Sequence, residues 1–424
     1  MKSTNKKSRP LYVIPSLLLL FMFVLQGCGL LNNANNEPNS GNPQTEEGIS
    51  ETNKNESDPI EEEPVEEDPT INIRIAAVGD IMAHETQLIS AYNTATDSYD
   101  FTSVFEDIRP IIEEADLAIG NFETTLAGPS KPYSGYPAFN APDTLVDALV
   151  TTGFDTLITV NNHSLDTGLA GLKRTVQVIE DKELDAVGTF NEIPESRFVL
   201  KEVEGIKIAI LAYTELINMD AGLSNEELNS ALNLMDKNRI LNDLEQVKSH
   251  NPDMIIAYMH WGNEYAKEAN AAQLSYAELL TQEGIDIIFG SHPHVIQKAE
   301  MVSVGDKQSF VTYSLGNFIS NQRRETLGEG FEPTEDGVIV TVDVEKNTDT
   351  NETTIQAIEM IPTWVYRAES DEENRYTFRI LPTESAIEQG TYSEEVLNKL
   401  KASQAETKSR LQFDFQSMIL NKKM

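Results

Sequence analysis

The sequence contains little cysteine and few basic residues for its length, and each shortage excludes a class of protein. A single cysteine among 424 residues excludes a framework of internal disulfides and a zinc site built from cysteines. The 32 lysines and arginines are outnumbered by 69 aspartates and glutamates, which gives a formal net charge of −37. Binding to nucleic acid or to anionic lipid requires clustered Lys and Arg, so neither fits this chain. The remaining composition, 40% hydrophobic and 24% charged, is typical of a globular protein.

A long apolar run lies near the N-terminus and predicts a targeting segment. Basic residues at positions 2–9 precede Leu11–Leu25, a run of 15 residues that is short for a membrane span of about 20. The run ends in Leu25-Gln26-Gly27-Cys28, which resembles a bacterial lipobox. In that interpretation residues 1–27 are a signal peptide and Cys28 becomes lipidated; the alternative is an uncleaved anchor. Both predict an extracytoplasmic protein attached to the cell membrane.

The composition changes near residue 70 and divides the rest of the chain. Residues 29–70 are rich in Asn, Pro, Ser and Glu, with 12 acidic residues and one basic residue. Since this stretch has almost nothing apolar to bury, we expect residues 28–70 to form a disordered, self-repelling linker behind the lipid anchor. The globular domain is expected over 71–367, followed by a partly helical C-terminal extension over 368–424.

Apolar runs alternate with helical patterns from Ile71 onward, which predicts an α/β protein with largely buried sheets. The stretch 198–213 predicts a hairpin that turns at Glu204-Gly205, and strands around 337–367 indicate a mixed sheet. The expected strands are Ile71–Val78, Leu117–Ile119, Thr156–Val160, Val199–Ala212, Met254–Tyr258, Ile285–Phe289, Phe310–Ser314 and Val338–Val344. The expected helices are Thr102–Glu114, Pro142–Thr152, Leu169–Lys182, Arg239–His250, Gln273–Glu283 and Glu394–Leu411.

Residues able to carry chemistry gather just after the predicted strands, where α/β proteins collect their ligand-binding groups. Five of the six histidines lie there. The segments are Gly79-Asp80-Ile81-Met82-Ala83-His84, Asn121-Phe122-Glu123, Asn161-Asn162-His163-Ser164-Leu165-Asp166, His260-Trp261-Gly262-Asn263-Glu264, Ser291-His292-Pro293-His294 and Ser314-Leu315-Gly316-Asn317.

Each segment alone also has a purely structural interpretation. Asp80 could cap a turn, Asn121 and Glu123 could form a hydrogen-bonding corner, and His260 could be a packed core histidine. The pair His292 and His294 is more specific, because the proline between them fixes their spacing and lets both imidazoles face one point.

Together, these imidazoles, carboxylates and amide form a mixed nitrogen and oxygen donor set. Such a set suits Mn²⁺, Fe or Zn²⁺ better than Ca²⁺ or Mg²⁺. The ligands suffice for two divalent transition metal ions with a carboxylate between them, which is the arrangement of two-metal hydrolases.

The order of these motifs resembles the calcineurin-like metallophosphoesterase superfamily and, within it, the CapA (PgsA) family linked to poly-γ-glutamate capsule synthesis. The resemblance covers about residues 72–365. It implies two packed mixed β-sheets flanked by helices, a four-layer α/β/β/α fold.

The resemblance also implies roles for individual residues. Asp80 and His294 would bind one metal ion, and Glu123 would stand where the superfamily has its bridging aspartate. The second ion would be bound by Asn162, His260 and His292. His163, assisted by Asp166, would protonate a leaving group or grip a substrate oxygen. The residues with an expected role in substrate binding are Asn121, Glu264, Asn317 and Arg323.

Two positions depart from the superfamily pattern. Met82 stands where the phosphoesterases have a histidine two residues after the first aspartate, and His84 lies four residues after Asp80. His84 either reaches the site or belongs to the first turn of a helix. Glu123 replaces an aspartate, so it either bridges two ions, binds one of them, or acts as a base.

The resemblance predicts a surface lipoprotein that makes, exports or attaches poly-γ-glutamate, with membrane synthase subunits as partners. Its metal site would act on an amide or ester of the polymer or hold its carboxylates. The alternatives are an extracytoplasmic metal-dependent phosphoesterase acting on a phosphoester or envelope polymer, and a non-catalytic scaffold. A protein of charge −37 repels a polyanion, so contact needs metal ions or local cations. Arg323-Arg324 either supplies such cations or is a solvated loop.

Overall fold

The computed structural model describes residues 69–220, 222–328, 333–370 and 375–413. The predicted signal peptide, Cys28 and nearly all of the 28–70 linker lie outside these residues. Among the helices of the described ranges, none has the length and apolar character needed to cross a membrane.

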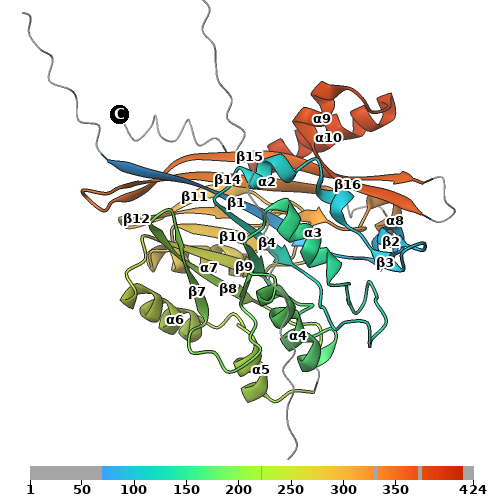
Figure 1. Ribbon diagram of the computed structural model, residues 1–424. Coiled ribbons are helices and arrows are strands. Elements are labelled where there is room, and N and C mark those ends of the chain that lie inside the picture. Colours follow the sequence, from blue (N-terminus) through green and yellow to red (C-terminus); the bar gives the residue numbers. More distant parts are fainter. Residues whose placement is uncertain (1–68, 221, 329–332, 371–374, 414–424) are drawn as a thin grey trace, which may run out of the picture. The chain divides into compact units, whose positions relative to one another are not determined.

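Two mixed β-sheets form the centre of the structure, as the sequence predicts (Figure 1). The first sheet has eight strands, in the spatial order β16 (Tyr376–Pro382), β15 (Thr353–Glu369), β14 (Asp336–Asn347), β1 (Thr70–Ile81), β4 (Leu117–Phe122), β5 (Thr156–Ile158) and β6 (Asp185–Val187), with β13 (Asn317–Ile319) beside the end of β1. The second has six, in the order β11 (Ala299–Val304), β12 (Lys307–Thr312), β10 (Ile287–Ser291), β9 (Met254–His260), β8 (Ile206–Thr214) and β7 (Phe198–Val203). The short strands β2 (Tyr92–Asn93) and β3 (Ser98–Tyr99) pair separately.

Helices flank the two sheets (Figure 1). They are α1 (Glu85–Ala91), the 3-10 helix η1 (Thr102–Phe105), α2 (Arg109–Glu113), α3 (Thr144–Thr152), α4 (Gly168–Glu180), α5 (Asn225–Ala231), α6 (Lys237–Ser249), α7 (Ala271–Gln282), α8 (Arg324–Leu327), α9 (Thr383–Gln389) and α10 (Glu394–Leu411). Figure 1 shows α9 and α10 together beside β15, where Leu400 packs in one cluster with Trp364 and Leu381.

Side-chain alternation along the strands produces four layers. In β9, Ile256 and Tyr258 face the first sheet, whereas Ile255 and Ala257 face the opposite way. The core between the sheets contains residues from both, and a second core packs the first sheet against α2 and α3. A third core packs the second sheet against α6 and α7. The predicted α/β/β/α layering is confirmed.

The prediction of one helix over Thr102–Glu114 is wrong. The structure has η1 followed by a separate short helix α2, with Pro110 in the first turn of α2. Proline lacks the N–H that a continuous helix would use there, but it fits a first turn well. The predicted hairpin at 198–213 is present as β7 and β8, which pair antiparallel. The expected domain boundary at residue 367 falls inside β15, and β16 continues the same sheet.

Parallel strands of both sheets end at one place. In the first sheet Asp80 of β1 is paired in register with Asn121 of β4. In the second sheet Ser291 of β10 is paired with His260 of β9. The sheets are also joined across the core, because the Tyr258 hydroxyl donates a hydrogen bond to the Val78 carbonyl at 2.8 Å. The residues just beyond this bond, at the ends of β1 and β9, therefore face each other.

Candidate metal centre

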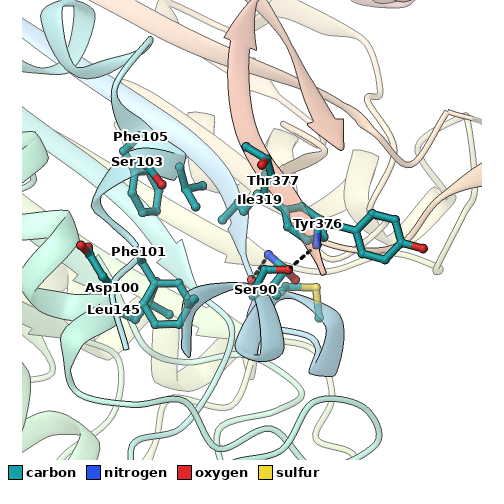
Figure 2. A pocket seen from close by; sticks show the side chains of 14 residues that line it. Ser90, Asp100, Phe101, Ser103, Phe105, Leu145, Ile319, Tyr376 and Thr377 are labelled. Atoms are coloured by element: carbon teal, nitrogen blue, oxygen red, sulfur yellow. Dashed lines mark hydrogen bonds between the residues drawn. The ribbon is translucent and has the colours of Figure 1, made fainter. Parts of the chain in front are cut away.

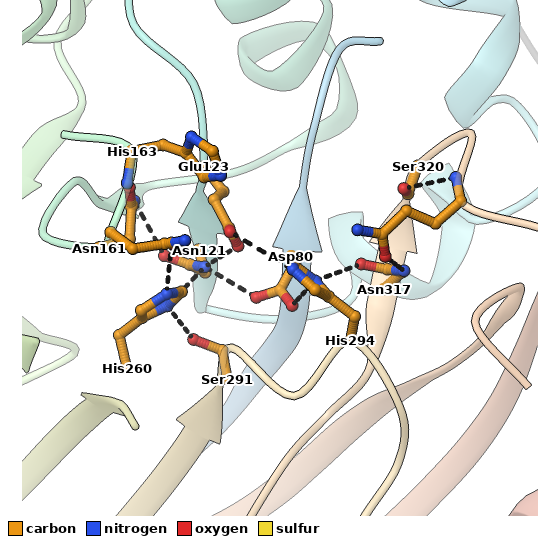
Figure 3. Close-up of polar contacts among 12 residues, drawn as sticks. Asp80, Asn121, Glu123, Asn161, His163, His260, Ser291, His294, Asn317 and Ser320 are labelled. Carbon is orange, nitrogen blue, oxygen red and sulfur yellow. Dashed lines mark hydrogen bonds and ion pairs between the residues drawn. The ribbon is translucent and has the colours of Figure 1, made fainter. Parts of the chain in front are cut away.

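The strand ends bring two carboxylates and an amide into one buried cluster (Figure 3). Asp80, Asn121 and Glu123 are fully buried. The Asn121 amide nitrogen donates to Asp80 Oδ1 at 2.8 Å and to Glu123 Oε2 at 3.1 Å. Burial, followed by the charge of Asp80, raises the pKa of Glu123 well above its usual value. Burial also opposes ionisation of Asp80, but the hydrogen bond and charge of His294 outweigh it and lower the pKa of Asp80. Two carboxylates this close favour a cation between them.

His294 contacts both carboxylates. Its Nδ1 lies 3.0 Å from Asp80 Oδ2 and 3.1 Å from Asn317 Oδ1, so acceptors on two sides keep a proton on Nδ1. Its Nε2 lies 3.8 Å from Glu123 Oε1. Burial lowers the pKa of His294, but the hydrogen bond from Nδ1 to Asp80 and the charge of Asp80 raise it above the ordinary value.

His260 and His292 complete the cluster from the second sheet. His260 Nε2 lies 2.9 Å from Asn162 Oδ1, and its Nδ1 lies 3.0 Å from Ser291 Oγ. The rings of His260 and His292 are 4.8 Å apart. Burial, followed by the nearby histidine charge, lowers the pKa of His260 well below its usual value and that of His292 to about 3. Both imidazoles are therefore neutral, the form that binds metal ions.

The backbone at the two histidines is strained. His292 has φ of 95° and His294 has φ of 58°, both in the left-handed region that residues with a Cβ rarely adopt. His292 also precedes Pro293, which normally favours an extended conformation. Such strain concentrates at functional sites, where the surrounding structure holds it in place. Here it allows two imidazoles separated by one residue to approach the same carboxylates.

The donor atoms fit metal binding. His292 Nδ1 and Glu123 Oε1 are buried and have no hydrogen-bond partner among the described residues. Buried polar atoms almost always have a hydrogen-bond partner, so a buried imidazole nitrogen and a buried carboxylate oxygen without one, in a cluster of ligand-type side chains, indicate a missing ligand. Two groups of side chains in the described ranges have ligand atoms within 4.8 Å of one another. They are Asp80, Glu123 and His260, and Glu264, His292 and His294.

A histidine–carboxylate pair lies beside the metal cluster, in the turn after β5. His163 Nδ1 is 2.7 Å from Asp166 Oδ2, and both side chains are buried. Asp166 Oδ2 also accepts a hydrogen bond from the Phe139 backbone N–H at 2.7 Å, and the Phe139 ring packs edge-on against His163. Asp166 therefore fixes the imidazole through Nδ1, while Nε2 lies 3.4 Å from the Asn218 amide nitrogen.

Three residues that the sequence did not single out position this site. Asn218 donates its backbone N–H to Asn162 O at 2.9 Å, and its amide lies 3.4 Å from His163 Nε2. Asn161 accepts from the His163 backbone N–H at 3.1 Å, and Ser291 contacts His260. Asn161 and Ser291 directly precede the predicted ligands Asn162 and His292, so their place in the sequence could have predicted their role. Asn218 belongs to no motif, so only the folded structure reveals its role.

The residues expected to bind substrate have different surroundings. Asn121 bridges the carboxylates. Both polar atoms of the Asn317 amide have partners: Oδ1 contacts His294, and the amide nitrogen donates to Gln322 and to the Thr334 carbonyl. Glu264 is exposed beside His292 and His294.

Arg323 is buried, so the solvated-loop alternative is wrong for this residue, while its expected contact with substrate stays a prediction. Arg323 is 3% exposed, because it packs over Trp364 and its guanidinium is bound by Glu325, Glu335 and the Val365 carbonyl. The adjacent Arg324 is paired with Glu335 at 2.9 Å. These arginines stabilise the fold.

The two departures from the superfamily pattern occupy distinct places. Met82 is buried and lines a cavity of about 110 Å³ on the other side of β1, together with Phe101, Phe105 and Leu145 (Figure 2). It offers no ligand atom to the cluster. His84 is the N-cap residue of α1, and its Nδ1 accepts from the Asn321 backbone N–H at 3.3 Å. Burial, followed by the charges of His294 and His163, lowers its pKa to about 3. His84 therefore begins a helix and also lies beside the site.

Comparison with known proteins identifies a matching family and two similar proteins. The family model described as "Bacterial capsule synthesis protein PGA_cap" matches residues 74–322. The chain is 30% identical over 278 residues to the capsule biosynthesis protein CapA of Bacillus anthracis, and the match covers 63% of each chain. It is 28% identical over 275 residues to the PGA biosynthesis protein CapA of Bacillus subtilis (strain 168), covering 64% of this chain and 67% of the relative.

Among solved structures, the chain is similar to the calcineurin-like phosphoesterase YfkN from Bacillus subtilis, with 15% identity and a TM-score of 0.39 over 80% of this chain and 98% of that one. It is also similar to the NAD nucleotidase of Haemophilus influenzae, with 12% identity and a TM-score of 0.41 over 79% and 62%.

Proposed function

The chain belongs to the bacterial capsule synthesis family PGA_cap, and from that premise we propose that it takes part in making, exporting or attaching poly-γ-glutamate outside the cytoplasm. The names of the two Bacillus relatives support this assignment. The lipobox-like sequence before Cys28 supports a lipid anchor on the cell membrane, which would place the domain beside membrane synthase subunits. The matched segment spans about 63% of the Bacillus anthracis relative.

We further propose that the buried cluster holds two divalent transition metal ions, with Mn, Fe and Zn as the candidates. The observation that carries this is the presence of two groups of close-lying ligand atoms, each with one buried atom, Glu123 Oε1 or His292 Nδ1, that has no hydrogen-bond partner within the described residues. When bound, such ions polarise a substrate oxygen and supply hydroxide near neutral pH. The residues that would hold them are Asp80, Glu123, Asn162, His260, His292 and His294.

The protein's own groups supply orientation and a proton site. Asp166 holds the His163 ring through Nδ1, so Nε2 is the atom able to give a proton to a leaving group or to grip a substrate oxygen. Asn121 separates the two carboxylates and keeps both aimed at one point. This arrangement supports hydrolysis or transfer at an amide or ester of the polymer.

The charge of the protein limits how a polyanion can approach. The net charge is −37, and the arginine pair at 323–324 is paired with acidic side chains. Positive charge for binding the polymer must therefore come mainly from the metal ions, which makes metal loading a condition for polymer contact.

The test begins with the metal content of the full-length protein and of a variant with His292→Ala and His294→Ala. We expect about two ions per chain in the wild type and their loss in a variant that keeps its circular dichroism spectrum. Absence of metal after loading with Mn²⁺ and Zn²⁺ would exclude the hydrolase.

The loaded protein is then assayed on γ-linked glutamate polymer and on phosphoesters, with Asp80→Ala as the control. Asp80-dependent cleavage of phosphoesters alone would favour the phosphoesterase. Metal binding without any cleavage, and an unchanged capsule in cells carrying Asp80→Ala, would favour a scaffold.

A further inference from the structure

The loop after β9 places Glu264 beside His292 and His294, which follow β10. Two backbone hydrogen bonds fix this loop: Trp261 N–H donates to the Ser291 carbonyl at 3.1 Å, and Tyr265 N–H donates to the Pro293 carbonyl at 2.8 Å. Tyr265 has φ of 62°, a left-handed backbone conformation that turns the chain back toward Pro293. The position of Glu264 next to His292 and His294 is therefore built into the fold.

The Glu264 side chain differs from the other donors of the centre. Its carboxylate lies within 4.8 Å of ligand nitrogens of His292 and His294, yet it is exposed and makes no hydrogen bond or ion pair with the described residues. Asp80, Glu123 and His260 are fully buried and held by their neighbours. The buried, unpaired His292 Nδ1 shows independently that this side of the cluster lacks a partner.

The donors therefore divide by exposure into two half-sites. The inner half-site consists of Asp80, Glu123 and His260 and has no contact with solvent. The outer half-site consists of Glu264, His292 and His294 and has one solvent-exposed carboxylate. A ligand carboxylate that is exposed and otherwise unbound can leave a metal ion at little cost, whereas a buried one cannot.

We propose that Glu264 is an exchangeable ligand of the outer half-site: it completes this metal position in the free protein and is displaced by a carboxylate of the substrate. The inference rests on the proposed function and adds a substrate class, a chain bearing free carboxylates near the bond that reacts. Exchange of one carboxylate for another leaves the charge of the metal position unchanged. The displaced Glu264 carboxylate moves into solvent, where water screens its charge, so a strongly acidic protein can bind an acidic chain without an extra anionic ligand on the metal ion.

The experiment measures two affinities in the full-length protein and its Glu264→Gln variant. The first is the binding of Mn²⁺, counted as free ion by electron paramagnetic resonance. The second is the binding of a short γ-linked glutamate oligomer at Mn²⁺ concentrations that saturate both proteins. Glu268→Gln is the matched control, because it removes the same charge from an exposed residue four positions along the same loop.

Glu264→Gln should weaken one of the two Mn²⁺ sites by about tenfold or more and leave the other unchanged. The same variant should bind the oligomer about threefold or more tightly, since the competing carboxylate is gone. Glu268→Gln should change neither affinity. A residue with only a structural role would not move the two affinities in opposite directions.

Several results would overturn the inference. Unchanged Mn²⁺ binding in Glu264→Gln would show that Glu264 is not a ligand. Weaker Mn²⁺ binding together with weaker oligomer binding would show a fixed ligand that substrate does not displace. A wild type that binds no Mn²⁺ would refute this inference and the metal-dependent function together. If the wild type binds Mn²⁺ and Glu264→Gln shows both expected shifts, but the wild type cleaves no substrate, the inference stands and only the hydrolase is refuted.

Discussion

At the scale of single residues, His163 is the side chain for which we propose a role in proton transfer and not in metal binding. Its ring is buried and is held by Asp166 at 2.7 Å and by the edge of Phe139. It does not belong to either group of close-lying ligand atoms, whereas its sequence neighbour Asn162 contacts His260. The proposal therefore assigns different roles to neighbouring residues of one turn.

Replacement of His163 by Ala should leave the metal content unchanged and lower the rate of any metal-dependent cleavage by about 10²–10⁴-fold, the usual contribution of a positioned acid or base. Metal analysis and steady-state kinetics on the same preparation measure both quantities. Ser164→Ala, at the adjacent buried position, controls for general damage to the turn. Loss of metal in His163→Ala would instead make His163 a ligand.

At the scale of secondary-structure elements, a hydrogen bond within the core links the two strands that carry Asp80 and His260. Tyr258 of β9 donates to Val78 of β1, and each lies two residues before a predicted ligand of its own strand. The bond therefore sets the distance between Asp80 and His260 from within the core.

Tyr258→Phe should lower the free energy of unfolding by about 1–2 kcal/mol, because a buried carbonyl loses its partner, and it should also weaken metal binding. Tyr213→Phe is the matched control, since its hydroxyl bonds Asp243 on the opposite face of the second sheet. Denaturant unfolding and Mn²⁺ titration of both variants test this. Equal metal affinity in the two variants would contradict the role assigned to the bond.

The contact between α10 and β14 depends on a buried carboxyl. Asp336 Oδ1 accepts from the Ser403 hydroxyl at 2.7 Å, and Oδ2 has no partner among the described residues. Burial raises the pKa of Asp336 to about 7. In the unfolded chain the carboxyl titrates near 3.8, so between these values the folded protein holds a proton that the unfolded chain releases.

Stability should therefore fall as pH rises from about 4 to about 7, at up to ~1.4 kcal/mol per pH unit from this group. Asp336→Asn removes the titration, so its stability relative to wild type should increase over this range and stay constant above it. Thermal unfolding at several pH values measures the difference. A parallel pH response of wild type and Asp336→Asn would refute the assignment.

At the scale of the whole molecule, the net charge affects how fast an acidic polymer associates with the protein. With 69 acidic residues against 32 basic ones, long-range repulsion opposes a polyanion at every approach. Salt screens this repulsion, because the Debye length falls from about 30 Å at 0.01 M to about 10 Å at 0.1 M. The short-range attraction of a buried metal site is screened much less.

Association of the Mn²⁺-loaded protein with a γ-linked glutamate oligomer should therefore become faster as salt rises from 0.01 M to 0.1 M, the reverse of the behaviour of basic proteins with polyanions. Stopped-flow mixing with a fluorescent oligomer measures the rate. An uncharged oligomer of similar length should show little change. A rate that falls with salt would reveal a basic binding surface.

The fold class and most residues of the candidate metal centre could be predicted from the sequence. Alternating apolar runs and helical patterns are local signals, so the α/β class, the hairpin at 198–213 and the helix at Glu394–Leu411 could be predicted from neighbouring residues. The packing of two mixed sheets was implied by the family resemblance. The histidines and carboxylates could be predicted to meet because parallel strands bring their ends to one edge. The long helix expected at 102–114 failed because Pro110 outweighs the apolar pattern.

The tertiary structure alone decided which polar residues remain available for binding. Arg323 and Asn317 look free in the sequence, but they are buried and paired by segments far from them in the chain. Asn218 reaches His163 from a loop without any motif. Glu264 stays exposed although it belongs to the same motif as the buried His260. Burial and pairing depend on contacts between distant segments, and these exist only once the sheets have packed.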